Sequence, residues 1–64
     1  MAKELAEMLR DAIRKSGEPL LTIAKATGVG VSSLSEFMNG ADMRLANASK
    51  IAAYLGFELR KKNG

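Results

Sequence analysis

Apolar residues recur at helical spacing in separate stretches of the chain, and polar residues fill the positions between them. In the first stretch the apolar residues fall at i, i+3, i+4, i+7 and i+8, namely Leu5, Met8, Leu9, Ala12 and Ile13. This period is typical of a helix with one buried face. Charged residues cover the expected solvent side, where Glu7 and Arg10 are three apart and predict a favourable ion pair. With Ser16-Gly17 as a C-terminal stop, the pattern predicts a helix over residues 3–15.

Two short helices are predicted on either side of a turn that contains two glycines. Proline suits the first turn of a helix, so the first of these helices runs over residues 19–27 with Ile23 and Ala24 inward. Gly28 ends it, because glycine adopts a positive φ without a Cβ clash. Gly30 takes the N-cap position of the next helix, which covers residues 31–38. The inward positions of that helix are Leu34, Phe37 and Met38.

Several apolar residues near these helices have less regular places. Val29 stands between the two glycines and is expected to plug the core at the turn. Leu20 and Leu21 are adjacent on a short helix, so they cannot both be fully buried. Met43 leaves two alternatives open, an exposed apolar side chain or a plug of the core.

The last periodic stretch predicts a helix over residues 45–55, which Gly56 caps. Its inward stripe consists of Leu45, Ala48, Ile51, Ala52 and Leu55. The tail over residues 57–64 alternates apolar and charged residues at its start and predicts a short extended segment. The sequence therefore predicts an all-α fold, a single domain over residues 1–64 with a short extended C-terminal tail.

Composition narrows the choice of partners and cellular compartment. A chain of 64 residues fits one domain, and the absence of cysteine excludes a disulfide framework. The net charge of +3 permits a polyanionic partner without requiring one. The N-terminus does not predict a signal peptide, and no apolar run approaches the roughly 18 residues of a membrane span. We therefore expect a cytoplasmic protein that does not enter a membrane.

Catalysis is not expected from this sequence. The chain has no histidine and no cysteine, so the usual bases, nucleophiles and soft metal ligands are missing. Ser32, Ser33 and Ser35 have no activating base nearby in sequence. We expect no catalytic residue, no metal, no cofactor and no small-molecule substrate.

The glycine turn belongs to a longer spacing pattern, A-x3-G-x5-L-x2-F, formed by Ala24, Gly28, Leu34 and Phe37. A small residue lets the second helix cross closely, the glycine makes the turn, and the apolar pair locks the helices at a fixed angle. The pattern predicts a helix-turn-helix. The alternative is a generic αα-hairpin in a helical bundle, which needs neither this spacing nor a small residue at position 24.

Two segments, LTIAKATGVGVSSLSEFMNG and LANASKIAAYLG, resemble the Cro- and lambda-repressor-like helix-turn-helix domains of bacterial and phage transcriptional regulators. The resemblance extends over residues 5–59. It implies a compact bundle of four or five helices that binds double-stranded DNA, with the helix over residues 31–38 in the major groove. The base-reading positions that it implies are Gly30, Val31, Ser32, Ser35 and Glu36. The phosphate-contacting positions that it implies are Pro19, Leu20, Leu21, Ser33, Asn39, Gly40 and Arg44.

The chain departs from that family in the chemistry of its recognition helix. Residues 31–38 contain no lysine or arginine, so guanine readout by arginine is not available from this helix. Val31 can instead pack on a thymine methyl group, and Glu36 can accept a hydrogen bond from a cytosine amino group. Arg44 stands where relatives often have a serine or threonine N-cap, which is reasonable if it meets a phosphate. The alternatives are a merely solvated Arg44 and an Asn39 that only ends its helix.

A second class of function stays open, together with two origins. The cluster of apolar residues at Leu20, Leu21, Val31 and Met43 also fits a protein-interaction module. We expect no second domain of the kind through which many repressors of this family dimerise or sense ligands. It therefore fits either a natural regulator that acts as a homodimer or a designed miniature that binds DNA as a monomer.

Overall fold

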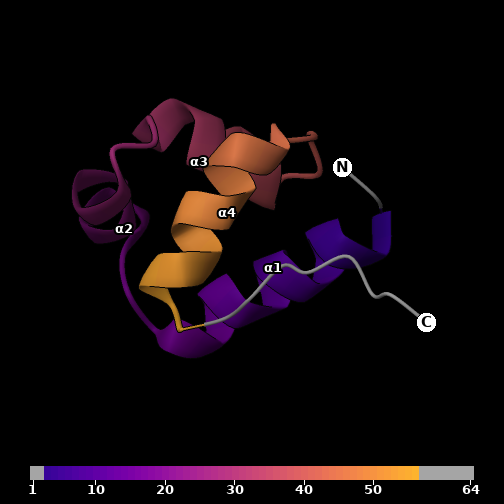
Figure 1. Ribbon diagram of the computed structural model, residues 1–64. Coiled ribbons are helices and arrows are strands. Elements are labelled where there is room, and N and C mark those ends of the chain that lie inside the picture. Colours follow the sequence, from indigo (N-terminus) through magenta and orange to yellow (C-terminus); the bar gives the residue numbers. More distant parts are fainter. Residues whose placement is uncertain (1–2, 57–64) are drawn as a thin grey trace.

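Four α-helices make up the part of the chain that the structure, a computed structural model, describes, which is residues 3–56 (Figure 1). They are α1 (Lys3–Ser16), α2 (Leu20–Thr27), α3 (Val31–Met38) and α4 (Leu45–Tyr54). No strand occurs within the described residues. The predicted all-α class is confirmed for this part, and each helix boundary agrees with the sequence pattern within one residue. The predicted extended tail over residues 57–64 lies outside the described residues.

Glycine and proline set the ends of these helices. α1 ends before Gly17, which has a φ of +70° and whose N–H donates to the Arg14 carbonyl. Pro19 is the N-cap residue of α2 rather than its first helical residue, and its carbonyl accepts hydrogen bonds from the next turn. These residues place the three shorter helices together on one side of the long α1 (Figure 1).

All four helices contribute to one hydrophobic core. Its largest fully buried side chains are Leu9, Ile23, Leu34, Phe37 and Ile51. α2 packs against both α3 and α4. The predicted inward positions of α2 and α3 are confirmed, with Met38 partly buried against the same core. The core therefore holds α3 by its apolar side.

The predicted buried face of α1 is wrong in its orientation. The buried residues are Ala6, Leu9, Arg10 and Ile13, whereas Met8 is 51% exposed. Leu5 and Ala12 lie at the edges of the buried stripe and are half-buried. The helix is rotated about its axis relative to the prediction, so Arg10 occupies the core side in place of Met8. The predicted Glu7–Arg10 ion pair does form, at 3.1 Å.

The predicted inward stripe of α4 is wrong at its first position. Leu45 is 56% exposed, and Met43 is buried in the core. The loop before α4 thus supplies the core side chain that the helix was expected to supply. The alternative in which Met43 plugs the core is therefore correct. Ala48, Ile51 and Ala52 are buried as predicted, and Leu55 is partly buried.

Candidate nucleic-acid interface

α3 has two chemically different sides. Leu34 and Phe37 are fully buried. The opposite side is exposed and consists of Val31, Ser32, Ser33, Ser35 and Glu36. All five belong to the predicted interface, and Gly30 is exposed just before them. The apolar side is held by the core, so the remaining side of α3 is free to contact a partner.

The turn between α2 and α3 fixes how that exposed side is presented. The N–H of Gly28 donates a hydrogen bond of 2.8 Å to the Ala24 carbonyl, and Gly28 has a φ of +81°. Val29 is buried, as the sequence predicts. Gly30 is the N-cap of α3, and its carbonyl accepts from the Leu34 N–H at 3.1 Å.

Thr27 is a residue of this turn that sequence reasoning missed. Its hydroxyl donates to the Ile23 carbonyl at 2.7 Å and accepts from the Val29 N–H at 3.3 Å. The side chain thereby satisfies a backbone donor in a segment where the helix ladder has stopped. The role of Thr27 could have been predicted from one signal in the sequence, which is a threonine directly before the glycine of a helix C-cap.

The starts of α2, α3 and α4 share one property. Their N-cap residues are Pro19, Gly30 and Arg44, and none of these makes a side-chain capping hydrogen bond. The first N–H groups of a helix have no intrahelical acceptor and lie at the positive end of the helix dipole. Such groups are suitable donors to phosphate oxygens.

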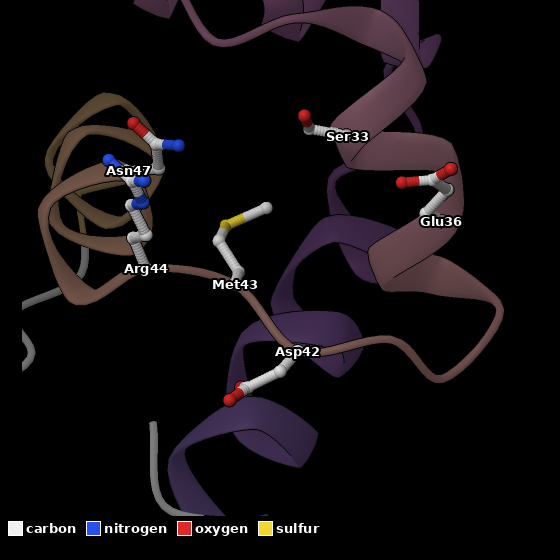
Figure 2. Close-up of a pocket in the computed structure, with 6 residues that line it drawn as sticks. All are labelled: Ser33, Glu36, Asp42, Met43, Arg44 and Asn47. Carbon is white, nitrogen blue, oxygen red and sulfur yellow. The ribbon is translucent and has the colours of Figure 1, made fainter.

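A hollow of about 180 Å³ separates α3 from the start of α4 (Figure 2). It is lined by Ser33, Glu36, Asp42, Met43, Arg44 and Asn47. Ser33 and Glu36 come from α3, whereas Arg44 and Asn47 lie together at the start of α4 on the other side (Figure 2). The structure thus brings together three of the predicted site residues, Ser33, Glu36 and Arg44.

The charges around this hollow are divided. Arg44 is the one cation among its lining residues, and the two carboxylates are Glu36 and Asp42. The pKa of Asp42 is lowered, first by the hydrogen bond from the Met43 N–H and, to a smaller degree, by the positive charge of Arg10. Asp42 is therefore ionised at neutral pH, so an anionic partner is favoured only at the Arg44 side of the hollow.

The other predicted phosphate-contacting residues lie away from the hollow. Pro19 and Leu21 are exposed at the start of α2, and Leu20 is partly buried against the core. Asn39 and Gly40 are exposed in the turn that follows α3. None of the five lines the hollow. A single partner that meets all of them would have to extend from the start of α2 to the start of α4.

Arg10 is the buried residue that the sequence interpretation placed wrongly in solvent. Its side chain reaches the end of α3, where the Nε donates to the Phe37 carbonyl at 2.7 Å. Position 10 lies four residues after Ala6 and three before Ile13, so helical spacing alone permits a buried side chain there. Arginine is rarely buried without partners, and the carbonyl groups that bind Arg10 lie 27 and 31 residues away in the chain, so the spacing did not predict its burial.

Comparisons of the chain with known protein families, with curated proteins and with solved structures found no match. Within residues 3–56, no helix has both the length and the apolar character needed to cross a bilayer. In the same range, no group of three acidic side chains is placed to hold a metal ion.

Proposed function

We propose that this protein binds double-stranded DNA in a sequence-specific manner, with α2, the turn and α3 acting as a helix-turn-helix of the Cro- and lambda-repressor-like type. The observation that carries the proposal is the two-sided nature of α3. Leu34 and Phe37 are fully buried while Val31, Ser32 and Glu36 are exposed, and α3 follows α2 after a turn of three residues. This is the arrangement in which a second helix enters the major groove.

The dimensions and the side chains of α3 suit the major groove. The groove is about 12 Å wide, and a helix with its side chains is about 10–12 Å across. The small serines on the exposed side permit a close approach to the base edges. Val31 supplies an apolar contact for a thymine methyl group, and Glu36 supplies an acceptor for a cytosine amino group. The preferred site therefore contains thymine and cytosine contacts rather than an arginine-bound guanine.

The phosphate contacts in this proposal come from few charges and several helix starts. Arg44 and the N–H groups at the start of α2 approach the backbone on the two sides of α3. The recognition helix has no cation of its own, and phosphate neutralisation supplies most of the non-specific affinity. We therefore expect weak non-specific binding that weakens further as salt rises, with a log–log slope of about −0.9 for each phosphate contact.

A protein-interaction module is the second candidate function. Leu21 and Val31 are 53% and 42% exposed, and Leu45 is also exposed. Exposed apolar residues favour a protein partner when they are contiguous. The two functions differ in salt dependence, because an apolar protein interface responds little to ionic strength whereas binding to DNA weakens as salt rises.

Selection from a random duplex library at moderate salt tests the proposal. Enrichment of one motif of about five to seven base pairs indicates a monomer reading one face of the major groove. A palindrome with half-sites about one helical turn apart indicates a homodimer. A natural regulator would meet this site on the chromosome in the cytoplasm, and a designed miniature would bind it as a monomer. If no duplex is bound even at low salt, the DNA proposal is wrong and the protein partner takes its place.

A further inference from the structure

The guanidinium group of Arg10 joins α1 to the chain on both sides of the turn that follows α3. Its Nε donates to the Phe37 carbonyl at 2.7 Å, and its Nη2 donates to the Ala41 carbonyl at 3.0 Å. Its Nη1 donates to Glu7 at 3.1 Å. The guanidinium carbon lies 4.5 Å from the centroid of the Phe37 ring. All three nitrogens have acceptors, so the planar group is held in one orientation.

The turn that Arg10 contacts is itself closed by hydrogen bonds. Gly40 has a φ of +111°, and its N–H donates to the Phe37 carbonyl at 3.0 Å. The N–H of Ala41 donates to the Glu36 carbonyl, also at 3.0 Å. This pair of bonds is the Schellman arrangement of a helix C-terminus. Arg10 gives the Phe37 carbonyl a second donor and binds the Ala41 carbonyl beyond the turn.

The burial of the Arg10 side chain removes a charged group from water, which is unfavourable. Arg10 is 8% exposed, and within residues 3–56 it is the one charged side chain that is buried. Burial of a charged side chain costs free energy unless hydrogen bonds satisfy it, and the side chain of its ion-pair partner Glu7 is 60% exposed. The hydrogen bonds to the Phe37 and Ala41 carbonyls satisfy the buried cation and thereby fix the turn after α3 relative to α1.

The turn held by Arg10 lies between the two parts of the candidate interface, which are the exposed side of α3 and Arg44. Ser35 and Glu36 lie on the last turns of α3, and Arg44 follows the turn within a few residues. We propose that Arg10 is a positioning residue for DNA recognition, which fixes the exposed side of α3 relative to Arg44 without touching the DNA. This inference rests on the proposed function.

The test compares Arg10→Met with Lys15→Met in the full chain. Methionine fills the space of the arginine stem without its donors. Lys15 is an exposed cation on the same helix, paired with Asp11 at the surface, so its replacement removes the same charge. Affinity is measured for the selected duplex and for a scrambled duplex, under conditions where circular dichroism shows each protein to be folded.

We expect Arg10→Met to lower the ratio of the two affinities about tenfold, the size of one lost base contact. Arg10→Met and Lys15→Met should bind the scrambled duplex with the same affinity. Arg10→Lys retains the charge and one donor, so its ratio of the two affinities should lie between those of Arg10→Met and the native chain. If Arg10→Met does not fold, Arg10→Lys takes its place in the comparison. A ratio equal to that of the native chain, or one lowered equally by Lys15→Met, would overturn the inference.

Amide hydrogen exchange separates this inference from the proposed function. In Arg10→Met the amides of Gly40 and Ala41 should exchange about tenfold faster than in the native chain, because the turn opens locally. The amides of Ile51 and Ala52 in α4 should be unaffected. Unchanged exchange at the turn contradicts a positioning role for Arg10 with any partner. A native chain that prefers no duplex, but whose turn responds in this way, contradicts only the DNA proposal.

Discussion

The N–H of Gly28 donates a hydrogen bond of 2.8 Å to the carbonyl of Ala24, and this bond ends α2. The chain turns away from the helix axis directly after this bond because Gly28 adopts a φ of +81°. A Cβ added at Gly28 would meet no atom within 4 Å. The requirement for glycine therefore comes from the backbone conformation and not from lack of space.

Replacement of Gly28 by valine should destabilise the fold. A β-branched residue resists positive φ, and the left-handed conformation costs roughly 1–2 kcal/mol per residue with a side chain. For a domain of this size we expect the Tm to fall by about 4–8 °C for each kcal/mol. Gly28→Asn is the matched control, because asparagine tolerates the left-handed region and should cost less. The Tm of both variants is measured by thermal unfolding. A valine variant with the same Tm as the native chain would disprove the role of this turn.

The turn could be predicted from sequence because its causes are local. Glycine at positions 28 and 30 and apolar residues at Leu34 and Phe37 act within a few residues of one another. Helical spacing alone then decides which side of α3 is buried. The exposure of Val31, Ser32 and Glu36 follows directly from it.

Other features depend on how the helices meet and could not be predicted in this way. The burial of Arg10 depends on two carbonyl groups, at Phe37 and Ala41, that lie 27 and 31 residues away in the chain. Met43 is buried in the core where Leu45 was predicted, and this depends on the path of the loop before α4. The hollow beside α3 likewise joins residues of two helices and a loop, so Asn47 and Asp42 escaped the sequence interpretation.

Replacement of Arg44 by serine should raise stability and lower affinity for DNA. Arg44 has the extended backbone of an N-cap, with φ −63° and ψ 142°, but makes no side-chain cap. Serine supplies such a cap and is expected to stabilise the fold by about 0.5–2 kcal/mol. Loss of the cation should weaken binding to all duplexes alike and reduce the salt slope by about one. Urea unfolding and binding titrations at several salt concentrations measure the two effects.

Two variants check this assignment of Arg44. Arg44→Ala removes the cation without supplying a cap, so it should share the weaker binding but not the added stability. Lys50→Ala removes an exposed cation from the same helix, away from the hollow. If Lys50→Ala reduces the salt slope as much as Arg44→Ala does, Arg44 makes no specific phosphate contact.

Replacement of Glu36 by alanine should change base preference rather than only strength. A carboxylate that accepts from a cytosine amino group discriminates against other bases by about 1–3 kcal/mol. Its removal should erase the preference at one base pair and raise the affinity for duplexes that lack cytosine at that position, because repulsion from phosphate is relieved. Selection repeated with the variant measures this. Glu4→Ala removes an exposed acid from α1 and should leave the selected motif intact, whereas an intact motif with Glu36→Ala would exclude Glu36 from readout.

The hydrogen bond from the Tyr54 hydroxyl to the Glu18 carboxylate should make stability depend on alkaline pH. It joins the end of α4 to the segment before α2. The bond raises the pKa of Tyr54 above its usual 10.0, aided by burial and by the charge of Glu18. The folded chain thus prefers the protonated phenol. The contribution to stability is complete below the unfolded pKa and is lost as the pH rises through the folded pKa.

Spectroscopic titration measures this directly, because Tyr54 is the one tyrosine in the chain. Glu18→Ala should return the Tyr54 pKa toward about 10. Denaturant unfolding of the native chain and of Tyr54→Phe, from about pH 8 to about pH 11 around the usual tyrosine pKa, should show a stability difference that falls as the pH rises. Both chains contain the same lysines, so their titration cancels when the stability of Tyr54→Phe is subtracted from that of the native chain. A difference that is constant over this range would mean that the hydrogen bond is not maintained in solution.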